Sequence, residues 1–468
     1  MRTNTKILIL ALALALPLTT YAEKNLDDVS ITLTPPDDPD YFADHSTKVG
    51  DINNDGYDDV VLSSSYYGAN ERGALYLMYG RKKRFSAGEV TAVKMTGRSR
   101  EGIYVDTQDG GCDLNADGYD DVLVSTSNYN YDTLEYVRND RLYILYGRAK
   151  KFNDGRVTAH DYIDLADNIN LQLACNGDLN NDGYDDIVMG DASYDGSVDN
   201  AGRVQVITGH PGSLTTADYT AATTWNAPDN SGTTFGYSIG YAGDVNADGY
   251  ADLLISQVGN NELVDHGGKV YLVYGSGNVF SNDAIDDAVS WFGTTEDLYL
   301  GSMVSSAGDL NGDGFDDIVI GATYFSTDAA SNAGALYLYY GKAKPLAGGN
   351  IADNDSWIYG TAYHNYIGGS STVSFGQVDD DHFSDLVFYS FINPDTEHYG
   401  GEVYIQFGSK GQISSTPTTE LLKYYRLEHV TDGTDRMGDI TVADLNGNGQ
   451  ADIIVVNPNI SQVQVKYN

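Results

Sequence analysis

The sequence predicts an all-β fold, a seven-bladed β-propeller of four-stranded antiparallel blades. Three observations predict it: a nine-residue acidic pattern recurs seven times, its copies are almost evenly spaced, and each is flanked by short runs rich in β-branched and aromatic residues. A fixed period indicates one structural unit per copy. Short strands separated by turn residues, with little helical periodicity, indicate that each unit is a propeller blade.

The pattern reads DINNDGYDD at 51–59, and further copies start at Asp113, Asp178, Asp244, Asp309, Gln377 and Asp444. Successive starts differ by 62, 65, 66, 65, 68 and 67 residues. A strand is expected before each copy, a β-branched strand such as VVLSS directly after it, a third strand ending in Tyr-Gly or a near variant, and a more variable fourth strand. The expected blades are about 41–98, 101–165, 168–226, 234–293, 299–359, 366–425 and 434–468 plus 28–35.

The two ends of the chain suggest how the ring closes. Residues 1–22 resemble a signal peptide, with Arg2 and Lys6 before an apolar stretch and small residues ahead of a cleavage site after Ala22. The mature chain, 23–468, is then expected to be a single exported propeller, secreted or periplasmic. The last unit lacks a fourth strand, and the run VSITLT at 29–34 is expected to supply it. This closure removes two open sheet edges that would otherwise favour aggregation.

Composition narrows the function. The chain has 67 Asp and Glu against 27 Lys and Arg, a net charge of −40, which argues against nucleic acid or an anionic membrane surface as a partner. Because 41% of its residues are hydrophobic, disorder is not expected either. No other stretch approaches the length of a membrane-spanning helix, so no membrane insertion is expected. An ordered protein with so many carboxylates raises the question of what neutralises them, and bound cations are one answer.

The nine-residue pattern has the chemistry of a calcium loop. Ca²⁺ prefers six to eight oxygen ligands, which side chains at positions 1, 3, 5 and 9 and the carbonyl at position 7 can supply, while Gly at position 6 permits a sharp turn. The alternative for any single copy is an Asp-Gly turn between two strands. Five full copies favour Ca²⁺, with the ligands Asp51, Asn53, Asp55, Tyr57 and Asp59; Asp113, Asn115, Asp117, Tyr119 and Asp121; Asp178, Asn180, Asp182, Tyr184 and Asp186; Asp244, Asn246, Asp248, Tyr250 and Asp252; and Asp309, Asn311, Asp313, Phe315 and Asp317.

Two copies depart from the pattern. The seventh keeps Asp444, Asn446, Asn448 and Asp452 but loses one carboxylate, so weaker binding is expected. The sixth has Gln377 at position 1 and His382 where Gly is expected, and keeps Asp379, Asp381 and Asp385. Since His tolerates a positive φ less readily than Gly, its occupancy by Ca²⁺ stays open.

These loops, together with Phe235-Gly236 and Gly321-Ala322, resemble the FG-GAP repeat. That repeat builds the seven-bladed head of integrin α subunits and related bacterial propellers. The FG and GAP elements are degenerate elsewhere, with Phe42-Ala43 in the first unit and Leu300-Gly301 in the fifth. The resemblance implies adhesion or protein recognition, although a shared fold does not by itself transfer function.

A ligand face is expected opposite the acidic loops. The connections between second and third strands, and those from a fourth strand to the next blade, should meet there, and many aromatic residues collect on this face. Tyrosine gives rigid contact area at low entropic cost, although the same rings can simply pack between neighbouring loops. The candidates are Tyr66, Tyr67, Tyr129, Tyr131, Tyr194, Tyr324 and Phe325. Cys112 and Cys175 fall at the first strands of adjacent blades, where either a disulfide or two buried thiols can form.

The function expected from these features is a calcium-binding, monomeric protein-binding or adhesion module with an extracellular protein or glycan ligand. The alternative is a glycan-binding lectin or a polysaccharide lyase or hydrolase. No catalytic residues are assigned. The run GYSIG at 236–240 matches a nucleophile elbow, but it is expected on an inner strand with no helix after it, which that motif needs.

Overall fold

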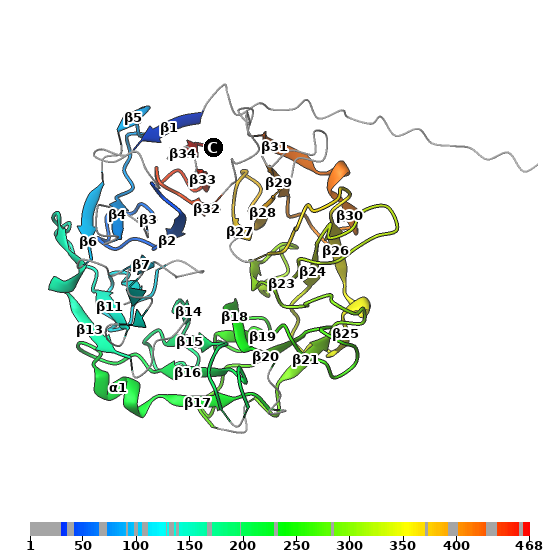
Figure 1. The fold of residues 1–468 in the computed structure, drawn as a ribbon. Helices are drawn as coiled ribbons and strands as arrows, with labels where there is room; N and C mark the ends of the chain where they lie inside the picture. The colour runs from blue at the N-terminus through cyan, green and yellow to red at the C-terminus, as the bar shows by residue number, and fades with distance from the viewer. Residues whose placement is uncertain are drawn as a thin grey trace, which may run out of the picture.

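The computed structural model describes residues 30–34, 42–64, 73–89, 92–97, 102–104, 111–127, 129–130, 135–136, 140–165, 171–196, 198–228, 233–281, 285–369, 373–391, 401–426, 438–457 and 462–468. Within them, seven four-stranded antiparallel sheets are arranged around a central axis (Figure 1). The predicted seven-bladed propeller is therefore confirmed. In each blade, strands that are neighbours in the sheet run antiparallel, and in blades 1 to 6 they follow one another along the chain.

The first three blades follow the chain order. Blade 1 consists of β2 (His45–Lys48), β3 (Val60–Ser64), β4 (Ala74–Met78) and β6 (Val93–Thr96). Blade 2 consists of β7 (Gly102–Tyr104), β8 (Val122–Ser127), β11 (Arg141–Leu145) and β13 (Asp161–Asp164), with a small hairpin of β9 (Tyr129–Asn130) and β10 (Glu135–Tyr136) beside it. Blade 3 consists of β14 (Leu171–Ala174), β15 (Ile187–Asp191), β16 (Arg203–Ile207) and β17 (Thr223–Asn226).

The remaining blades repeat the arrangement. Blade 4 consists of β18 (Phe235–Gly243), β19 (Asp252–Gln257), β20 (Lys269–Val273) and β21 (Val289–Phe292). Blade 5 consists of β22 (Val304–Gly308), β23 (Asp317–Ala322), β24 (Ala335–Tyr339) and β26 (Ser356–Tyr359). Blade 6 consists of β27 (Val373–Gly376), β28 (Asp385–Ser390), β29 (Glu402–Gln406) and β31 (Leu422–Arg426). Blade 7 consists of β32 (Asp439–Ala443), β33 (Asp452–Asn457), β34 (Gln462–Lys466) and β1 (Ser30–Thr34).

The N-terminal strand closes the ring, as predicted. β1 pairs antiparallel with β34, with Ser30 opposite Lys466 and Leu33 opposite Val463. Figure 1 shows this strand, in blue, beside the red C-terminal strands. The side chain of Leu33 is 1% exposed and belongs to the core between blades 7 and 1. The strand is therefore held both by backbone pairing and by apolar burial.

Short extra segments tie neighbouring blades together. After the third strand of a blade, the chain pairs in parallel with the outermost strand of the preceding blade. These segments are β5 (Gly88–Glu89) on β1, β12 (Gly155–Arg156) on β6, β25 (Gly349–Asn350) on β21 and β30 (Thr416–Pro417) on β26, the last three running into the 3₁₀ turns Val157–Ala159, Ile351–Asp353 and Thr418–Glu420. In blade 3 the helix α1 (Thr216–Ala221) follows the third strand instead, begun by a capping box between Thr215 and Asp218.

The hydrophobic core is divided among the blade interfaces. Seven clusters of buried side chains lie between neighbouring sheets, and the cluster between blades 4 and 5, for example, joins Leu254 and Trp291 to Ile318 and Tyr337. In blades 1 and 5, both faces of the second and third strands are covered, and these strands are largely apolar runs rather than alternating ones. A blade therefore buries its core only by contacting its two neighbours.

Candidate metal loops and the opposite face

The seven nine-residue segments, called the acidic loops here, each connect the first and second strands of a blade. All seven therefore lie at one end of the ring, the acidic-loop face. In six loops the residue at position 1 is Asp, and its carboxylate accepts backbone hydrogen bonds from positions 5 and 6. In the first loop, Asp51 accepts from the N–H of Asp55 at 2.9 Å and of Gly56 at 2.6 Å, and the same pair recurs in loops 2, 3, 4, 5 and 7.

Glycine at position 6 is required by the turn. Its φ lies between +84° and +93° in Gly56, Gly118, Gly183, Gly249, Gly314 and Gly449. Position 4 also adopts a positive φ in these loops, for example +54° in Asn54. The position-6 requirement was predicted from the sequence, whereas position 4 was not singled out because Asn, Ala and Gly all occur there. The two left-handed residues fold the acidic side chains back over the loop.

The carboxylate at position 9 joins each loop to the third strand of its own blade. Asp59 is fully buried and accepts hydrogen bonds from Ile52 N at 3.2 Å and Gly80 N at 2.8 Å. Burial is the main cause that raises the pKa of Asp59 to about 8; the hydrogen bond from Gly80 opposes this increase, and the nearby carboxylates of Asp55 and Asp51 add to it. The pKa values of Asp121, Asp186, Asp252 and Asp317 are also raised to about 8 by burial. Among the described residues, no Lys, Arg or His forms an ion pair with these five buried carboxylates.

The oxygens at position 3 provide an independent test of whether a hard cation fits. The side-chain oxygens of Asn180 and Asn246 are buried and have no hydrogen-bond partner within the part of the chain that the structure describes. An orphaned buried acceptor is uncommon and needs an explanation. A cation held by the oxygens at positions 1, 3, 5 and 9 would satisfy these acceptors and supply the missing positive charge. The donor set of the loops therefore fits calcium.

The sixth loop differs from the others. Oxygen atoms of Asp379, Asp381 and Asp385 lie within 4.8 Å of one another, the one such group of three carboxylates among the described residues. The grouping arises because position 3 is Asp here and Asn elsewhere. His382 adopts a φ of +74° at position 6, whereas Asp380 at position 4 is not left-handed. This loop is thus rich in carboxylates but differs in backbone conformation.

The seventh loop has one carboxylate fewer among its predicted ligands than the first five. Asn446 at position 3 donates its amide N–H to both carboxylate oxygens of Asp452, at 3.1 and 2.9 Å. Asn448, where the other loops have Asp, donates to the Asn468 carbonyl at 3.0 Å. Asn448 therefore replaces one carboxylate of the first five loops with an amide, while the bond from the position-3 Asn to the position-9 Asp also occurs in the first loop, from Asn53 to Asp59 at 3.2 Å.

Each acidic loop is also bonded to the next blade. The Asp at position 8 accepts the position-1 N–H of the preceding blade's loop: Asp51 N donates to Asp120 at 2.6 Å, and Asp244 N donates to Asp316 at 2.9 Å. The equivalent bonds join Asp113 to Asp185 and Asp444 to Asp58. Sequence reasoning missed this role, although Asp at position 8 in four of the seven copies was a visible signal.

Tyrosine hydroxyls form a second set of bonds between blades. The Tyr of the Tyr-Gly pair ending a third strand accepts a backbone N–H from the following blade, as from Phe152 to Tyr79 at 2.8 Å. The same bond recurs at Tyr146, Tyr274, Tyr340 and Tyr467, with distances of 2.7 to 2.8 Å. The last of these crosses the ring closure, from Phe85 in blade 1 to Tyr467 in blade 7.

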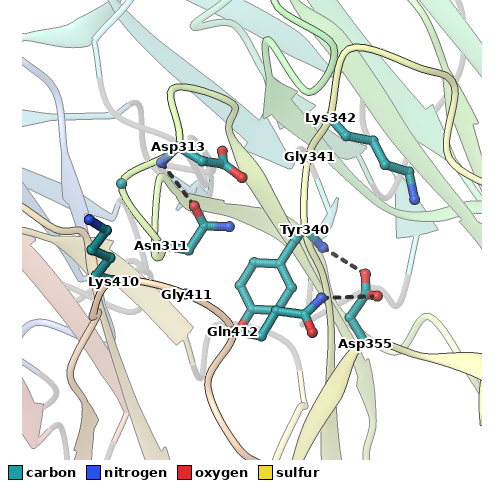
Figure 2. A pocket seen from close by; sticks show the side chains of 10 residues that line it. Asn311, Asp313, Tyr340, Gly341, Lys342, Asp355, Lys410, Gly411 and Gln412 are labelled. Atoms are coloured by element: carbon teal, nitrogen blue, oxygen red, sulfur yellow. Dashed lines mark hydrogen bonds between the residues drawn. The ribbon is translucent and has the colours of Figure 1, made fainter.

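A cavity of about 420 Å³ lies beside the fifth loop (Figure 2). Asn311 and Asp313 of the loop form one side, and Tyr340 and Asp355 form another. Lys342 of blade 5 and Lys410 of blade 6 lie on either side of the loop in Figure 2. Basic side chains that follow third strands therefore lie next to an acidic loop.

The predicted ligand-face residues have mixed outcomes. Tyr66, Tyr67 and Tyr131 lie outside the described residues, and of Tyr129 only its place in β9 is described. The guanidinium of Arg203 covers the ring of Tyr194 at 4.0 Å. Tyr324 is 45% exposed. Phe325 is half-buried and packs edge-on against Trp357, with ring centroids 5.2 Å apart, so it forms part of the blade 5 packing.

A row of aromatic rings crosses the opposite face over blades 4, 5 and 6. Ring contacts of 5.1 to 5.9 Å run from His266 to Tyr299, Tyr324, Tyr366 and His364. We call these five residues the aromatic row. Only Tyr324 was predicted, because Tyr299 and Tyr366 lie in connections between blades, where a positive φ (+50° and +51°) aims them. That conformation has no simple sequence signal.

A cavity of about 640 Å³ adjoins the aromatic row. Its lining includes the exposed rings of Tyr237 and Tyr324, the ring of Tyr299 and the exposed carboxylates of Glu296 and Asp297. His266 holds Asp297 through a 3.2 Å contact between Nδ1 and Oδ1. The cavity combines flat apolar surfaces with hydrogen-bond acceptors, which is typical of ligand sites.

Two further sequence features are placed by the structure. Cys112 and Cys175 form a disulfide between blades 2 and 3, with their Cα atoms 5.5 Å apart.

Ser238, the centre of the GYSIG run, lies on β18 and is 2% exposed, and its hydroxyl accepts the Val304 N–H at 3.2 Å. No helix follows β18, so this serine lacks the strand–turn–helix setting of a nucleophile elbow.

Comparisons with known proteins agree with this architecture. Three stretches, 45–78, 173–207 and 303–339, match the FG-GAP repeat, so the chain carries FG-GAP repeats. Each spans the first three strands of a blade. Over 164 residues the chain is 31% identical to a phosphatidylinositol-glycan-specific phospholipase D of Bos taurus, covering 34% of this chain and 18% of that protein. Over 191 residues it is 30% identical to integrin alpha-5 of Xenopus laevis, covering 38% of this chain and 17% of that protein.

The matched regions are thus under a fifth of those two proteins. A phosphatidylinositol-glycan-specific phospholipase D of Dictyostelium discoideum is 28% identical over 192 residues, 39% of this chain and 20% of its own length. The relatives include both an enzyme and integrins, so they point to a shared propeller rather than to one activity. Among the described residues, no helix is long and apolar enough to cross a membrane.

Proposed function

We propose that this protein is an exported, calcium-binding propeller that acts as a protein-binding module through the face opposite its acidic loops. The observation that carries the proposal is the aromatic row beside the cavity lined by Tyr237, Tyr299 and Tyr324. Exposed aromatic rings in a partly enclosed site supply most of the binding energy in many protein interfaces. The similarity to integrin alpha chains supports a protein as the partner.

The calcium part of the proposal rests on the acidic loops. Residues at positions 1, 3, 5 and 9 of the first five loops would hold the ions, with the position-7 carbonyls as further ligands, and the seventh loop would bind more weakly. Bound calcium would neutralise crowded carboxylates and fix the hairpin between the first two strands. The orphaned oxygens of Asn180 and Asn246 support this assignment. Total metal analysis after dialysis should find about five tightly held Ca²⁺ per chain.

The alternative ligand is a glycan. Glu296 and Asp297 line the same cavity as three tyrosine rings, and sugars combine an apolar face with hydroxyl donors that such a lining can meet. A lyase or hydrolase would additionally need an acid–base pair acting on the sugar. Product release from acidic polysaccharides would distinguish an enzyme from a lectin.

The test combines both ligand classes. The purified protein, in calcium, is applied to a panel of extracellular-matrix proteins and to a glycan array, and the double variant Tyr299→Ala/Tyr324→Ala is compared with it. Any ligand of this face should bind at least tenfold more weakly to the double variant. Tyr162→Ala is the matched control, because Tyr162 is 41% exposed but lies on the outer strand of blade 2. Equal losses in both variants, or none in the double variant, would exclude this face as the site.

The remaining assignments concern export and domain organisation. We propose that residues 1–22 are a leader removed on export, and that 23–468 form one monomeric propeller. N-terminal sequencing of protein recovered from an export-competent host should read Glu23 first, and light scattering should give the mass of one chain. The disulfide between Cys112 and Cys175 supports an oxidising compartment.

A further inference from the structure

Basic residues are concentrated on one face of this acidic protein. Ten of its 27 lysines and arginines lie in the short segments that follow the third strands of blades 1, 2, 5 and 6, namely Arg81, Lys82, Lys83, Arg84, Arg148, Lys150, Lys151, Lys342, Lys344 and Lys410. These segments lie on the acidic-loop face, because Arg81 N and Arg148 N donate to the loop carbonyls of Leu445 and Ile52 at 2.8 Å.

Seven of these ten cations belong to two consecutive blades. We call 81–84 in blade 1 and 148–151 in blade 2 the basic strip. Lys82, Lys83, Arg84, Arg148, Lys150 and Lys151 are all exposed, and the strip contains no Asp or Glu. Two short segments that together hold seven cations and no carboxylate are unusual in a chain with a net charge of −40.

The backbone holds the strip in place. Arg81 and Arg148 extend over the rings of Phe85 and Phe152, each at 4.2 Å. The N–H groups of these two phenylalanines donate to tyrosine hydroxyls of the preceding blades. The cations therefore project from segments that are already ordered, so a ligand would lose little affinity to the ordering of this backbone.

The charges of the strip are only partly engaged within the described part of the chain, where Arg84 donates to the Asn468 carbonyl at 3.0 Å. Among the described residues, Lys82, Lys83 and Lys150 form no ion pair with a carboxylate. Lys151 is the exception, with its Nζ 3.7 Å from Asp55 of the first acidic loop. The carboxylates that offset the strip electrostatically are therefore those of the acidic loops beside it.

We infer that the basic strip is a binding site for a linear acidic polysaccharide. Arginine and lysine recognise carboxylate and sulfate groups, and two basic segments on consecutive blades suit a chain that carries such groups at intervals. An anionic membrane fits less well, because the exposed large hydrophobic side chains of the described residues all lie outside these segments. The net charge conceals this site, since the opposing carboxylates are distributed over the rest of the surface.

Binding at the strip should depend on calcium, a part of the inference that rests on the proposed function of the acidic loops. Asp55 is one of the predicted ligands, so an ion in the first loop would engage the partner of Lys151. Ions in the neighbouring loops would also cancel the negative charge beside the strip. Attraction for a polyanion would then increase without any change of fold.

The test measures binding of heparin, a sulfated polysaccharide, to the full chain by titration calorimetry in calcium and in EGTA. The triple variant Lys82→Gln/Lys83→Gln/Arg84→Gln is compared with Lys342→Gln/Lys344→Gln/Lys410→Gln, which removes the same charge from the same face at blades 5 and 6. We expect the first variant to bind about tenfold more weakly and the second less than threefold, and binding to weaken with rising salt.

The outcomes are separable. Equal losses in the two variants, no heparin binding in calcium, or binding to vesicles of anionic phospholipid but not to heparin would overturn the site. Unchanged affinity in EGTA would overturn the calcium linkage if metal analysis of the same sample shows that its calcium has been removed. Absence of calcium in the native protein, with heparin binding intact at the strip, would reject the calcium part of the proposed function and leave the site in place.

Discussion

Single residues in this propeller connect one blade to the next. The Asp at position 8 of an acidic loop accepts a hydrogen bond from the loop of the preceding blade, and the Tyr that ends a third strand accepts one from the following blade. A mutation in one blade is therefore felt at two interfaces. In blades 4 and 7, Ala251 and Ala451 stand at position 8 in place of Asp, so this side-chain hydrogen bond cannot form there.

Replacing Tyr340 with Phe should destabilise the protein. The Tyr340 hydroxyl accepts the Ile413 N–H at 2.7 Å in a buried setting, and its removal leaves that N–H without a partner. An unsatisfied buried donor costs about 1–3 kcal/mol, so the free energy of unfolding, measured by urea denaturation, should fall by that amount. Tyr324→Phe is the control, because Tyr324 is exposed, and it should change stability by less than about 0.5 kcal/mol. A smaller loss at Tyr340 than at Tyr324 would contradict this account.

At this scale the sequence predicts acidic residues better than aromatic ones. Asp and Gly in the loops follow a fixed spacing, and the turn requires those residue types at those positions. The candidate Phe325 packs on Trp357, whereas Tyr299 and Tyr366, which were not among the candidates, lie in the aromatic row. Whether a ring faces solvent depends on the backbone conformation of a connection, which single-residue preferences do not determine.

The acidic loops behave as one element built in several variants. Loops 1 to 5 share the side-chain pattern, the seventh replaces one carboxylate with the amide of Asn448, and the sixth groups three carboxylates and has His382 at a positive φ. The pattern alone distinguished these three classes. It could not show that Asp380 departs from the left-handed conformation of position 4, because that depends on how the whole loop folds.

The sixth loop offers a matched pair of substitutions. His382→Gly should raise the free energy of unfolding by about 1 kcal/mol, because glycine adopts a φ of +74° without steric cost. Gly314→His in the fifth loop, where φ is +88°, should lower it by a similar amount. Both are measured by thermal unfolding in EGTA, so that metal binding does not contribute. Shifts of the same sign in the two variants would show that backbone strain does not control these loops.

The whole molecule is a ring of interdependent blades. Its core is divided into clusters, each formed between two neighbouring blades. The strand β1 completes the last blade and contributes to the cluster shared by that blade and the first. The repeat period predicted the number of blades and the closing strand, because each copy of the pattern specifies one hairpin. It did not predict α1, a six-residue helix that begins with a capping box and takes the place of the extra strand seen in other blades. It did not predict the basic strip either, because the net charge of the chain says nothing about where the cations lie.

Stability should depend on pH in opposite ways with and without calcium. Burial raises the pKa of five position-9 carboxyls to about 8. Each binds its proton more tightly in the folded chain than in the unfolded chain, where the pKa is about 3.9. In EGTA the stability is therefore fully present below about pH 4 and falls as the pH rises toward 8. In calcium, ion binding needs deprotonated ligands, so the melting temperature should rise over this range. Parallel trends in the two series would contradict the role of these carboxyls.

A defect in one acidic loop should weaken the whole ring in a single transition. The Asp309 carboxylate accepts three N–H groups of its own loop, and its carbonyl accepts the Ser384 N–H of blade 6 at 3.0 Å. Asp309→Ala should therefore lower the unfolding free energy in calcium by about 2–3 kcal/mol, from the lost hydrogen bonds and the weakened ion site. Because every blade completes its core against its neighbours, blade 5 should not unfold alone. Tryptophan fluorescence reports on blades 3, 4 and 5 through Trp225, Trp291 and Trp357, and circular dichroism reports on all seven, so the two curves should coincide. Asp328→Ala, an exposed substitution on the opposite face, is the control and should leave both unfolding curves unchanged. If in Asp309→Ala the fluorescence transition came before the circular dichroism transition, the blades would unfold independently.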